Sequence, residues 1–211
     1  MPLPIVLIGA GGHAKVVADI IKKTGAYEII GCTDPRKDNA LISWGIKYLG
    51  TDEILPELLQ TGVTRAAMGM AGFNNNIRRR LFEKVQEWGF DFPVLRHSAA
   101  NIAPEVRLSE AAIIMAAAVI NPDATIGKNV IINTGAIIEH DCIIGHSAQI
   151  GPGAILCGGV TIERGAFIGA GACIIQGKKI GQDAIIGSGA VVIKDVPAGV
   201  TVVGNPAKIK P

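Results

Sequence analysis

The sequence places a histidine next to an acid at His140-Asp141, and this pair is the first candidate for chemistry. An imidazole has an ordinary pKa of about 6.5, so near neutral pH it can take a proton from an amine or a hydroxyl. A carboxylate on its other ring nitrogen fixes the tautomer and stabilises the imidazolium that forms. A solitary surface histidine is often inert, so the residues alone leave a catalytic and a non-catalytic interpretation open. The other histidines in the sequence are His13, His97 and His146.

The second candidate site is a glycine-rich turn at residues 9–15, GAGGHAK. Free backbone N–H groups and a helix N-terminus at Gly11, Gly12 and His13 would suit a phosphate or diphosphate. The turn also fits GxGxxA, with Asp34 about twenty residues further on, so NAD and a nucleotide sugar are both open as ligands. A tight turn without a ligand is a third interpretation. The helix dipole disfavours a charged imidazole, so we expect a neutral, hydrogen-bonding His13.

A six-residue repeat organises the chain from Ile102 onward. This repeat must position His140 and Asp141, which lie within it. Neither a helix period of about 3.6 nor a strand period of 2 gives such a pattern. One large and one small apolar residue per short unit is typical of a solenoid. Three units would close a triangular coil, so residues 102–196 predict about five coils of a parallel β-helix. The large aliphatic positions are Ile102, Leu108, Ile114, Ile120, Ile126, Ile132, Ile138, Ile144, Ile150, Leu156, Ile162, Ile168, Ile174, Ile180, Ile186 and Val192.

The repeat also predicts where the side chains point. Gly, Asn and Asp recur three residues after the aliphatic positions, as expected for corners that need positive φ. His140 and His146 both come two residues after an aliphatic position. They should face outward at consecutive corners, too far apart to share a ligand within one chain. Cys142 falls at an inward position, so we reject it as a nucleophile.

Residues 1–97 have a different texture, in which strands and helices alternate. This alternation predicts a parallel sheet with a nucleotide crevice at its carboxyl edge, in a half-sized Rossmann-like domain. Residues 98–211 would form the β-helix with a C-terminal extension, and His97 would pack at the linker. The expected strands cover residues 4–9, 27–32 and 64–70, and the expected helices cover residues 14–23 and 76–88.

Bulk properties exclude several classes of protein. The net charge of +2 gives no electrostatic footprint for nucleic acid. The longest uncharged apolar run, residues 111–120, is too short to span a bilayer. The start of the sequence lacks the basic region of a signal peptide, and the 4 cysteines show no CxxC spacing. We therefore expect free thiols and a cytoplasmic protein.

Three strings together closely resemble one group of bacterial enzymes. NTGAIIEHDCIIG at residues 133–145, the GAGGHAK turn and GNPAK at residues 204–208 are similar to sugar acetyltransferases of the sialic-acid O-acetyltransferase and UDP-4-amino-sugar N-acetyltransferase group. The resemblance covers essentially the whole chain and implies a left-handed β-helix. It implies direct acetyl transfer from acetyl-CoA in a ternary complex, with His140 as general base and Asp141 orienting it. The acceptor would be the amino group of a UDP-4-amino-4,6-dideoxy sugar or, alternatively, a hydroxyl of a sialic acid.

The resemblance also implies binding residues. The nucleotide sugar would contact Gly11, Gly12, His13, Asp34 and Arg36. Acetyl-CoA would lie between two subunits of a homotrimer; the candidates for its contacts are His146, Gln149, Ala170 and Ser188. Gln149 stands where relatives often carry a second histidine.

Two rival functions are less consistent with the residues. Some β-helices of this kind carry a three-histidine zinc site, but the repeat offers two histidines on different faces and no third, so we expect no metal. A trimeric scaffold that binds a nucleotide sugar without catalysis would not need the His140-Asp141 pair.

Overall fold

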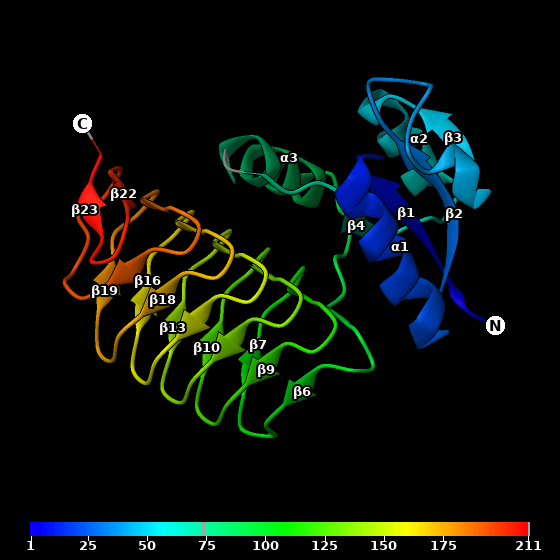
Figure 1. Ribbon diagram of the computed structural model, residues 1–211. Helices are drawn as coiled ribbons and strands as arrows, with labels where there is room; N and C mark the ends of the chain where they lie inside the picture. The colour runs from blue at the N-terminus through cyan, green and yellow to red at the C-terminus, as the bar shows by residue number, and fades with distance from the viewer. Residues whose placement is uncertain (73–74, 211) are drawn as a thin grey trace.

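The computed structural model describes residues 1–72 and 75–210, which form a small α/β domain followed by a β-helix (Figure 1). The elements of the first domain are β1 (Leu3–Ile8), α1 (Gly12–Thr24), β2 (Tyr27–Thr33), η1 (Ile42–Trp44), β3 (Tyr48–Gly50), η2 (Asp52–Ile54), α2 (Leu55–Gln60), β4 (Ala66–Met68) and α3 (Asn75–Glu87).

The four strands of this domain form a parallel sheet in the order β3-β2-β1-β4. Alternate residues of β1 face opposite sides, as a strand requires. Ile5 and Leu7 pack against the apolar stripe of α1, whereas Val6 and Ile8 pack with residues of α2 and α3. The predicted alternation of strands and helices is confirmed.

The β-helix is built from two-residue strands that form three flat faces. The first face contains β6 (Asn101–Ile102), β9 (Val119–Ile120), β12 (Ile137–Ile138), β15 (Ile155–Leu156), β18 (Cys173–Ile174) and β21 (Val191–Val192). The second contains β7 (Arg107–Leu108), β10 (Thr125–Ile126), β13 (Ile143–Ile144), β16 (Thr161–Ile162) and β19 (Lys179–Ile180). The third contains β5 (Leu95–Arg96), β8 (Ile113–Ile114), β11 (Ile131–Ile132), β14 (Gln149–Ile150), β17 (Phe167–Ile168), β20 (Ile185–Ile186), β22 (Thr201–Val203) and β23 (Lys208–Ile209).

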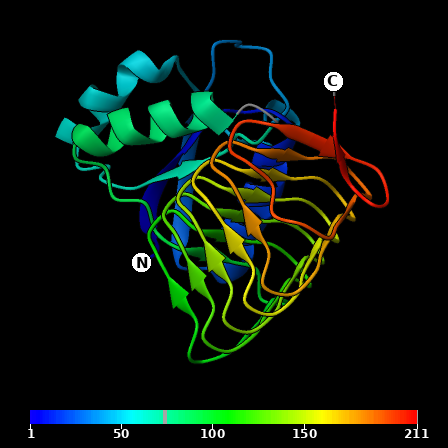
Figure 2. The same cartoon turned by 90° about the vertical axis from the view of Figure 1, so that its left-hand side faces the viewer.

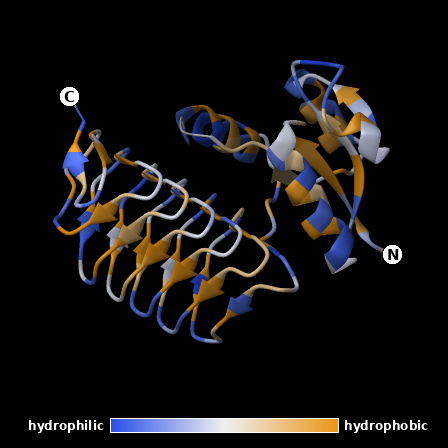
Figure 3. Ribbon diagram, in the orientation of Figure 1, coloured by the Kyte–Doolittle hydropathy of each residue, from blue (hydrophilic) through white to orange (hydrophobic). Residues whose placement is uncertain are grey.

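The strand register follows the predicted repeat. Ile137 pairs with Val119 on one side and with Ile155 on the other, so each coil takes eighteen residues. Every predicted large aliphatic position from Ile114 to Val192 is buried, and these side chains form one continuous core. Figure 3 shows many of these strands as apolar segments that recur along the coils. β5 lies one coil before β8 and extends the third face into the junction with the first domain.

The corners use the left-handed backbone that the repeat predicts. Every position three after a large aliphatic residue, from Ala111 to Gly189, has a positive φ. Many of these residues are glycine, but Asp141 (φ 61°) and Asn129 (φ 55°) adopt the same conformation. Asn and Asp tolerate this region better than other residues with a Cβ atom.

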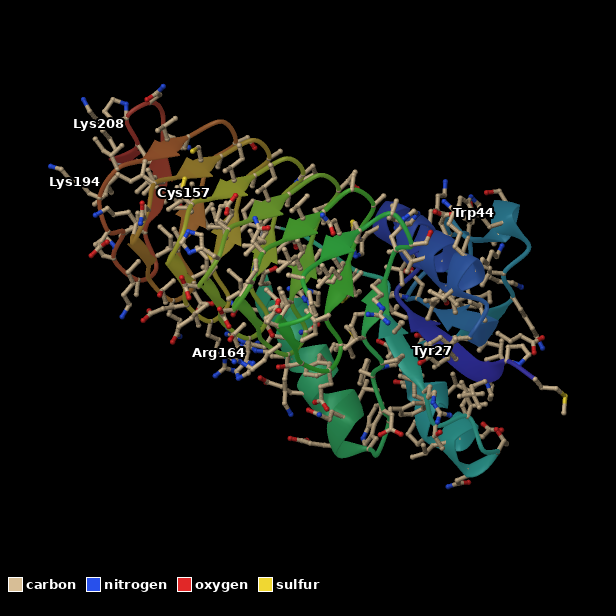
Figure 4. All side chains as sticks on the ribbon, turned by 90° about the horizontal axis from the view of Figure 1, so that it is seen from below. Tyr27, Trp44, Cys157, Arg164, Lys194 and Lys208 are labelled. Carbon is tan, nitrogen blue, oxygen red and sulfur yellow. The ribbon has the colours of Figure 1, made fainter. Side chains whose placement is uncertain are left out.

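The first domain docks on the β-helix in two places. Outward-facing Ile113 and Ile131 of the third face join the apolar cluster of α1. Figures 1 and 2 show helix α3 beside the coils, and its hydrogen bonds place it at the corner between the second and third faces. Arg79 of this helix pairs with Asp183 at 3.0 Å, and Arg164 of the β-helix pairs with Glu83 at 2.9 Å, beside α3 in Figure 4.

The C-terminal end of the third face changes direction. Strand β22 continues the parallel ladder, and β23 pairs with it antiparallel. Among the described residues, no helix has the length and apolar character needed to cross a bilayer.

Candidate active site

His140 and Asp141 form a close pair at the corner between the first and second faces. His140 follows β12, and the left-handed backbone at Asp141 turns the chain toward β13. The Nδ1 atom of His140 lies 2.8 Å from Oδ2 of Asp141. More than half of the His140 side chain is exposed, so the ring lies at the surface of the chain. The geometry is that of an imidazole oriented by a carboxylate.

The environment strengthens His140 as a base. Its hydrogen bond to Asp141 raises its pKa above the ordinary value; desolvation opposes this shift, and the charges of Asp141 and Glu139 add to it. A raised pKa favours the imidazolium that forms when the ring accepts a proton.

His146 occupies the same position in the next hexad, but its ring is engaged differently. Its Nδ1 atom accepts a hydrogen bond from the backbone N–H of Lys128, at 2.9 Å, eighteen residues earlier. The corresponding residue below His140 is Pro122, which has no N–H to donate. The backbone therefore leaves Nδ1 of His140 available for Asp141.

Gly158 lies one coil after His140 and makes room for its ring. A Cβ atom on Gly158 would lie 2.6 Å from Cε1 and 2.7 Å from Nε2 of His140. Both distances are too short for non-bonded atoms, so any larger residue would displace the imidazole. Gly158 was not predicted from the sequence, although the coil length of eighteen residues points to it.

Cys142 is fully buried, as its phase in the repeat predicts. Its Sγ atom lies 3.3 Å from the carbonyl oxygen of Cys157. Burial raises the pKa of this thiol to about 11, so it stays protonated near neutral pH. The thiolate is the nucleophilic form, and this agrees with the rejection of Cys142. All four cysteines are free.

The glycine-rich turn is braced by Asp34 from the end of β2. Oδ2 of Asp34 accepts a hydrogen bond from the N–H of Ala10 at 2.9 Å, and Oδ1 accepts one from the N–H of Arg36, also at 2.9 Å. The Arg36 side chain is largely exposed. A Cβ atom on Gly11 or Gly12 would meet nothing within 4 Å, so this turn borders open space. Asp34 thus holds the backbone of the turn in place through Ala10.

Gly69, at the end of β4, lies beside this turn and was not predicted. A Cβ atom on Gly69 would lie 2.9 Å from Cβ of Ala14 and in contact with the carbonyl oxygen of Gly9. The close approach of β4 to the start of α1 therefore requires glycine here.

His13 is neutral, as expected, but burial rather than the helix dipole is the main cause. Desolvation and then the positive charge of Arg78 lower its pKa to about 4. Its buried Nε2 atom has no hydrogen-bond partner in the described structure, so the expected hydrogen bond is absent at that atom.

Arg78 of α3 is a buried cation that was not predicted from the sequence. Its guanidinium donates to the carbonyl oxygen and to Oδ1 of Asn129, and to the carbonyl oxygen of Ser147 at 2.8 Å. Asn75 of the same helix donates to the carbonyl oxygen of Gly165 at 3.0 Å. These contacts join α3 to three successive coils at one corner. Burial lowers the pKa of Arg78 to about 9, which still leaves it charged near neutral pH.

The four acetyl-CoA candidates do not gather in one place within the chain. Ala170 and Ser188 lie one coil apart at the corner between the third and first faces, and both are exposed. His146 lies at the corner between the second and third faces. Gln149 is buried on the third face, where its Oε1 accepts a hydrogen bond from the N–H of Gly72 at 3.3 Å.

His97 packs at the junction of the two domains, as expected. Its Nε2 atom lies 3.1 Å from Nζ of Lys23 in α1, and its Nδ1 accepts a hydrogen bond from the N–H of Ala99. Among the residues that the structure describes, no three His, Cys, Asp or Glu side chains converge as metal ligands would.

Comparison with known proteins identifies both parts of the chain. Residues 4–85 match the PglD N-terminal domain family, and residues 141–176 match the bacterial transferase hexapeptide (six repeats) family. The left-handed β-helix implied by the resemblance is confirmed by the solved structures that superpose on the whole chain.

Three of these structures are sugar-acetylation proteins or their relatives. The perosamine N-acetyltransferase PerB from Caulobacter crescentus, solved with CoA and GDP-perosamine, is 38% identical over 99% of this chain and 97% of its own, with a TM-score of 0.93. The acetyltransferase domain of PglB from Neisseria gonorrhoeae, solved with acetyl coenzyme A, is 35% identical over 100% of both chains, with a TM-score of 0.92. WeeI from Acinetobacter baumannii is 29% identical over 99% of this chain and 100% of its own, with a TM-score of 0.85. The chain therefore belongs to the family of hexapeptide-repeat sugar N-acetyltransferases that carry a PglD-type N-terminal domain.

Proposed function

We propose that this protein transfers the acetyl group of acetyl-CoA to the amino group of a nucleotide-linked amino sugar. The observation that carries the proposal is the 2.8 Å pairing of His140 with Asp141 at an exposed corner. The similarity to PerB and to the PglB domain supports both substrates, since these proteins were solved with GDP-perosamine and with acetyl-CoA. The same similarity favours an amine over a sialic-acid hydroxyl as acceptor.

The chemistry needs one base and no covalent enzyme intermediate. As the sugar amine attacks the thioester carbon, a C–N bond forms and Nε2 of His140 takes the proton from the amine. Asp141 holds the other ring nitrogen and stabilises the imidazolium. When the C–S bond breaks, the imidazolium returns the proton to the CoA thiolate. The products are CoA and the N-acetylated sugar nucleotide.

We assign the nucleotide sugar to residues 1–97 and acetyl transfer to residues 98–211. Gly11, Gly12 and His13 would hold the diphosphate at the N-terminus of α1, with Asp34 and Arg36 beside it. His146, Gln149, Ala170 and Ser188 are the proposed contacts of acetyl-CoA. A cytoplasmic location agrees with these substrates and with the free cysteines.

A homotrimer would bring these groups together. His140 lies between the first and second faces, whereas His13 lies near Arg78, at the corner between the second and third faces. Base and crevice therefore lie at different corners of one chain. Packing against a neighbouring copy would place the crevice of one subunit opposite His140 of the next, and closed symmetry is the usual arrangement.

The first test follows thiol release from acetyl-CoA with a GDP-linked amino sugar, a UDP-linked amino sugar and free sialic acid. We expect release with a nucleotide-linked amine, and a loss of about 10²–10⁴-fold in His140→Ala, as is typical of a lost general base. Turnover close to wild type in His140→Ala would overturn the mechanism, and release with sialic acid alone would overturn the acceptor.

Mixed assemblies test the shared site. Gly12→Asp has space for its side chain and suits a helix N-terminus, but its charge should repel a diphosphate. Gly12→Asp and His140→Ala should each be inactive alone. Reassembled together, they should regain activity if base and crevice come from different subunits. If no activity returns although mixed trimers form, each site lies within one chain.

A further inference from the structure

A cleft of about 460 Å³ opens at the carboxyl ends of β2 and β3, and the proposed roles above leave it without a ligand. Its walls include Pro35 after β2, Thr51 after β3, Asp52 and Glu53 of η2, and Lys84 and Trp88 from α3 and the residue that follows it. The volume lies within the range of about 300–1,000 Å³ that is usual for ligand sites. The cleft combines apolar walls with two acidic side chains that can accept hydrogen bonds and one lysine that can donate them.

The position of the cleft fits one part of a nucleotide. The glycine-rich turn follows β1, and the sheet order places β2 next to β1 and β3 next to β2. Neighbouring strands are about 4.8 Å apart, so two strand steps carry the ligand about 10 Å along the edge of the sheet. With the diphosphate at the N-terminus of α1, the ribose would lie near Asp34 and the base would enter the cleft. We propose that this cleft is the nucleobase pocket and that its polar groups select guanine over uracil.

The two acids match the donors of guanine. The edge of guanine that pairs with cytosine carries an N–H and an amino group beside one carbonyl. Ionised Asp52 and Glu53 are acceptors only, and Lys84 is a donor only, so together they complement this edge. Uracil has a single N–H between two carbonyls, so one of its carbonyl oxygens would face a carboxylate. Thr33 donates to Oδ1 of Asp52 at 2.6 Å, which fixes the direction of that carboxylate.

Trp88 supplies a flat surface for the base. Nζ of Lys84 lies 4.8 Å from the centre of the indole ring. An exposed cation over a ring is held weakly, whereas a base stacked on an aromatic side chain is held more strongly. An entering base would therefore take the place of the ammonium on the ring. The freed Lys84 could then donate to the carbonyl oxygen of guanine.

This inference rests on the proposed function, which supplies the nucleotide. The selection of guanine over uracil is the claim that it adds. The chain contains 2 tryptophans, so the cleft has its own fluorescent reporter. Trp44, labelled in Figure 4, is a matched control. It also lies under a lysine, with Nζ of Lys22 at 5.4 Å from the ring centre, but it is not among the residues that line the cleft. Replacing one tryptophan isolates the signal of the other.

In Trp44→Phe, we expect GDP to quench the remaining emission of Trp88 and to bind at least about tenfold more tightly than UDP. In Trp88→Phe, the emission of Trp44 should not respond to GDP. Glu53→Gln should lower the affinity for GDP by about tenfold and leave that for UDP unchanged or higher. Glu57→Gln, which alters an exposed acid of α2 outside the cleft, should leave both affinities unchanged.

The results of these experiments distinguish a failure of the nucleobase pocket from a failure of the proposed function. Equal binding of GDP and UDP, or an unchanged ratio in Glu53→Gln, would overturn the selection of guanine. Acetyl transfer to a nucleotide-linked amine without quenching of Trp88 would overturn the pocket and leave the proposed function standing. If the wild-type protein neither binds a nucleotide nor transfers an acetyl group, the proposed function is overturned, and the inference with it.

Discussion

His140 and His146 occupy equivalent positions in successive hexads, yet their Nδ1 atoms have opposite kinds of partner. Nδ1 of His146 accepts from a backbone N–H at 2.9 Å, which fixes that nitrogen as an acceptor. Nδ1 of His140 faces the Asp141 carboxylate at 2.8 Å and must therefore carry the proton. Only His140 then has an unprotonated Nε2 as its outward nitrogen. The local backbone thus gives only one of two similar histidines the tautomer that the proposed general base needs.

Asp141→Asn should shift the pH dependence of the reaction. The hydrogen bond to Asp141 raises the pKa of His140, and the base acts only when it is neutral, so activity is lost as pH falls through this raised pKa. An amide at position 141 removes the negative charge, which lowers the pKa and moves the acid limb of kcat/KM to lower pH. The maximal rate should fall as well, because the imidazolium is less stabilised. An acid limb at the same pH in the variant would contradict the pairing.

Gly158→Ala should reduce catalysis through the ring of His140. The new methyl group would occupy space now held by Cε1 and Nε2, and misplacement of a catalytic group by about 1 Å can cost about 10²-fold. The double variant with His140→Ala supplies the control, because without an imidazole the methyl group has nothing to displace. We expect Gly158→Ala to lower kcat in the wild-type background and to have no further effect in His140→Ala. Equal losses in both backgrounds would show that Gly158 acts elsewhere.

His13 should make the protein less stable in acid. The folded imidazole binds a proton only below about pH 4, whereas the unfolded one does so below about pH 6.5. The unfolded state therefore binds more protons between these values, and the free energy of unfolding falls there by at most about 3 kcal/mol. Denaturant titrations from pH 7 to pH 4 measure this loss. His13→Gln should remove this part of the slope, and an unchanged slope would place the acid sensitivity at other groups.

Arg78→Met should loosen the attachment of α3 to the β-helix. It leaves the carbonyl oxygens of Asn129 and Ser147 without their donor, and an unsatisfied buried polar group costs about 1–3 kcal/mol. Arg80→Met, two residues further along the same helix and exposed, should change the free energy of unfolding by less than about 0.5 kcal/mol. Urea unfolding of both variants makes the comparison. Similar stability of the two would contradict a role for the buried guanidinium.

The β-helix was predictable because its repeat constrains every coil in the same way. The aliphatic positions counted from Ile102 are the core, and the corner positions adopt the expected backbone. β5 was not predicted, since a single pair of residues before the repeat carries no periodicity. In the first domain, the predicted helices differ from α1 and α3 by one or two residues at their ends.

The site was predictable only where the residues lie close in sequence. His140 and Asp141 are neighbours, so adjacency and repeat phase together indicated their pairing. Arg78 lies among three consecutive arginines of a basic helix, and only the docking of α3 shows that it is the buried one. Lys84 and Trp88 line one cleft with residues of η2 because of the packing of the first domain, which no local pattern encodes.

The eighteen-residue coil also constrains how such a chain can change in length. Insertion of one whole coil would leave every later residue on its own face and merely lengthen the prism. Insertion of a single hexad would keep the core pattern intact but rotate all later residues to the next face. Ala170 and Ser188 would then move to another corner, away from a fixed His140, in a protein that still folds. Natural length variation in such chains should therefore occur in whole coils between the base and the C-terminal corners, and in any number of residues only at the ends.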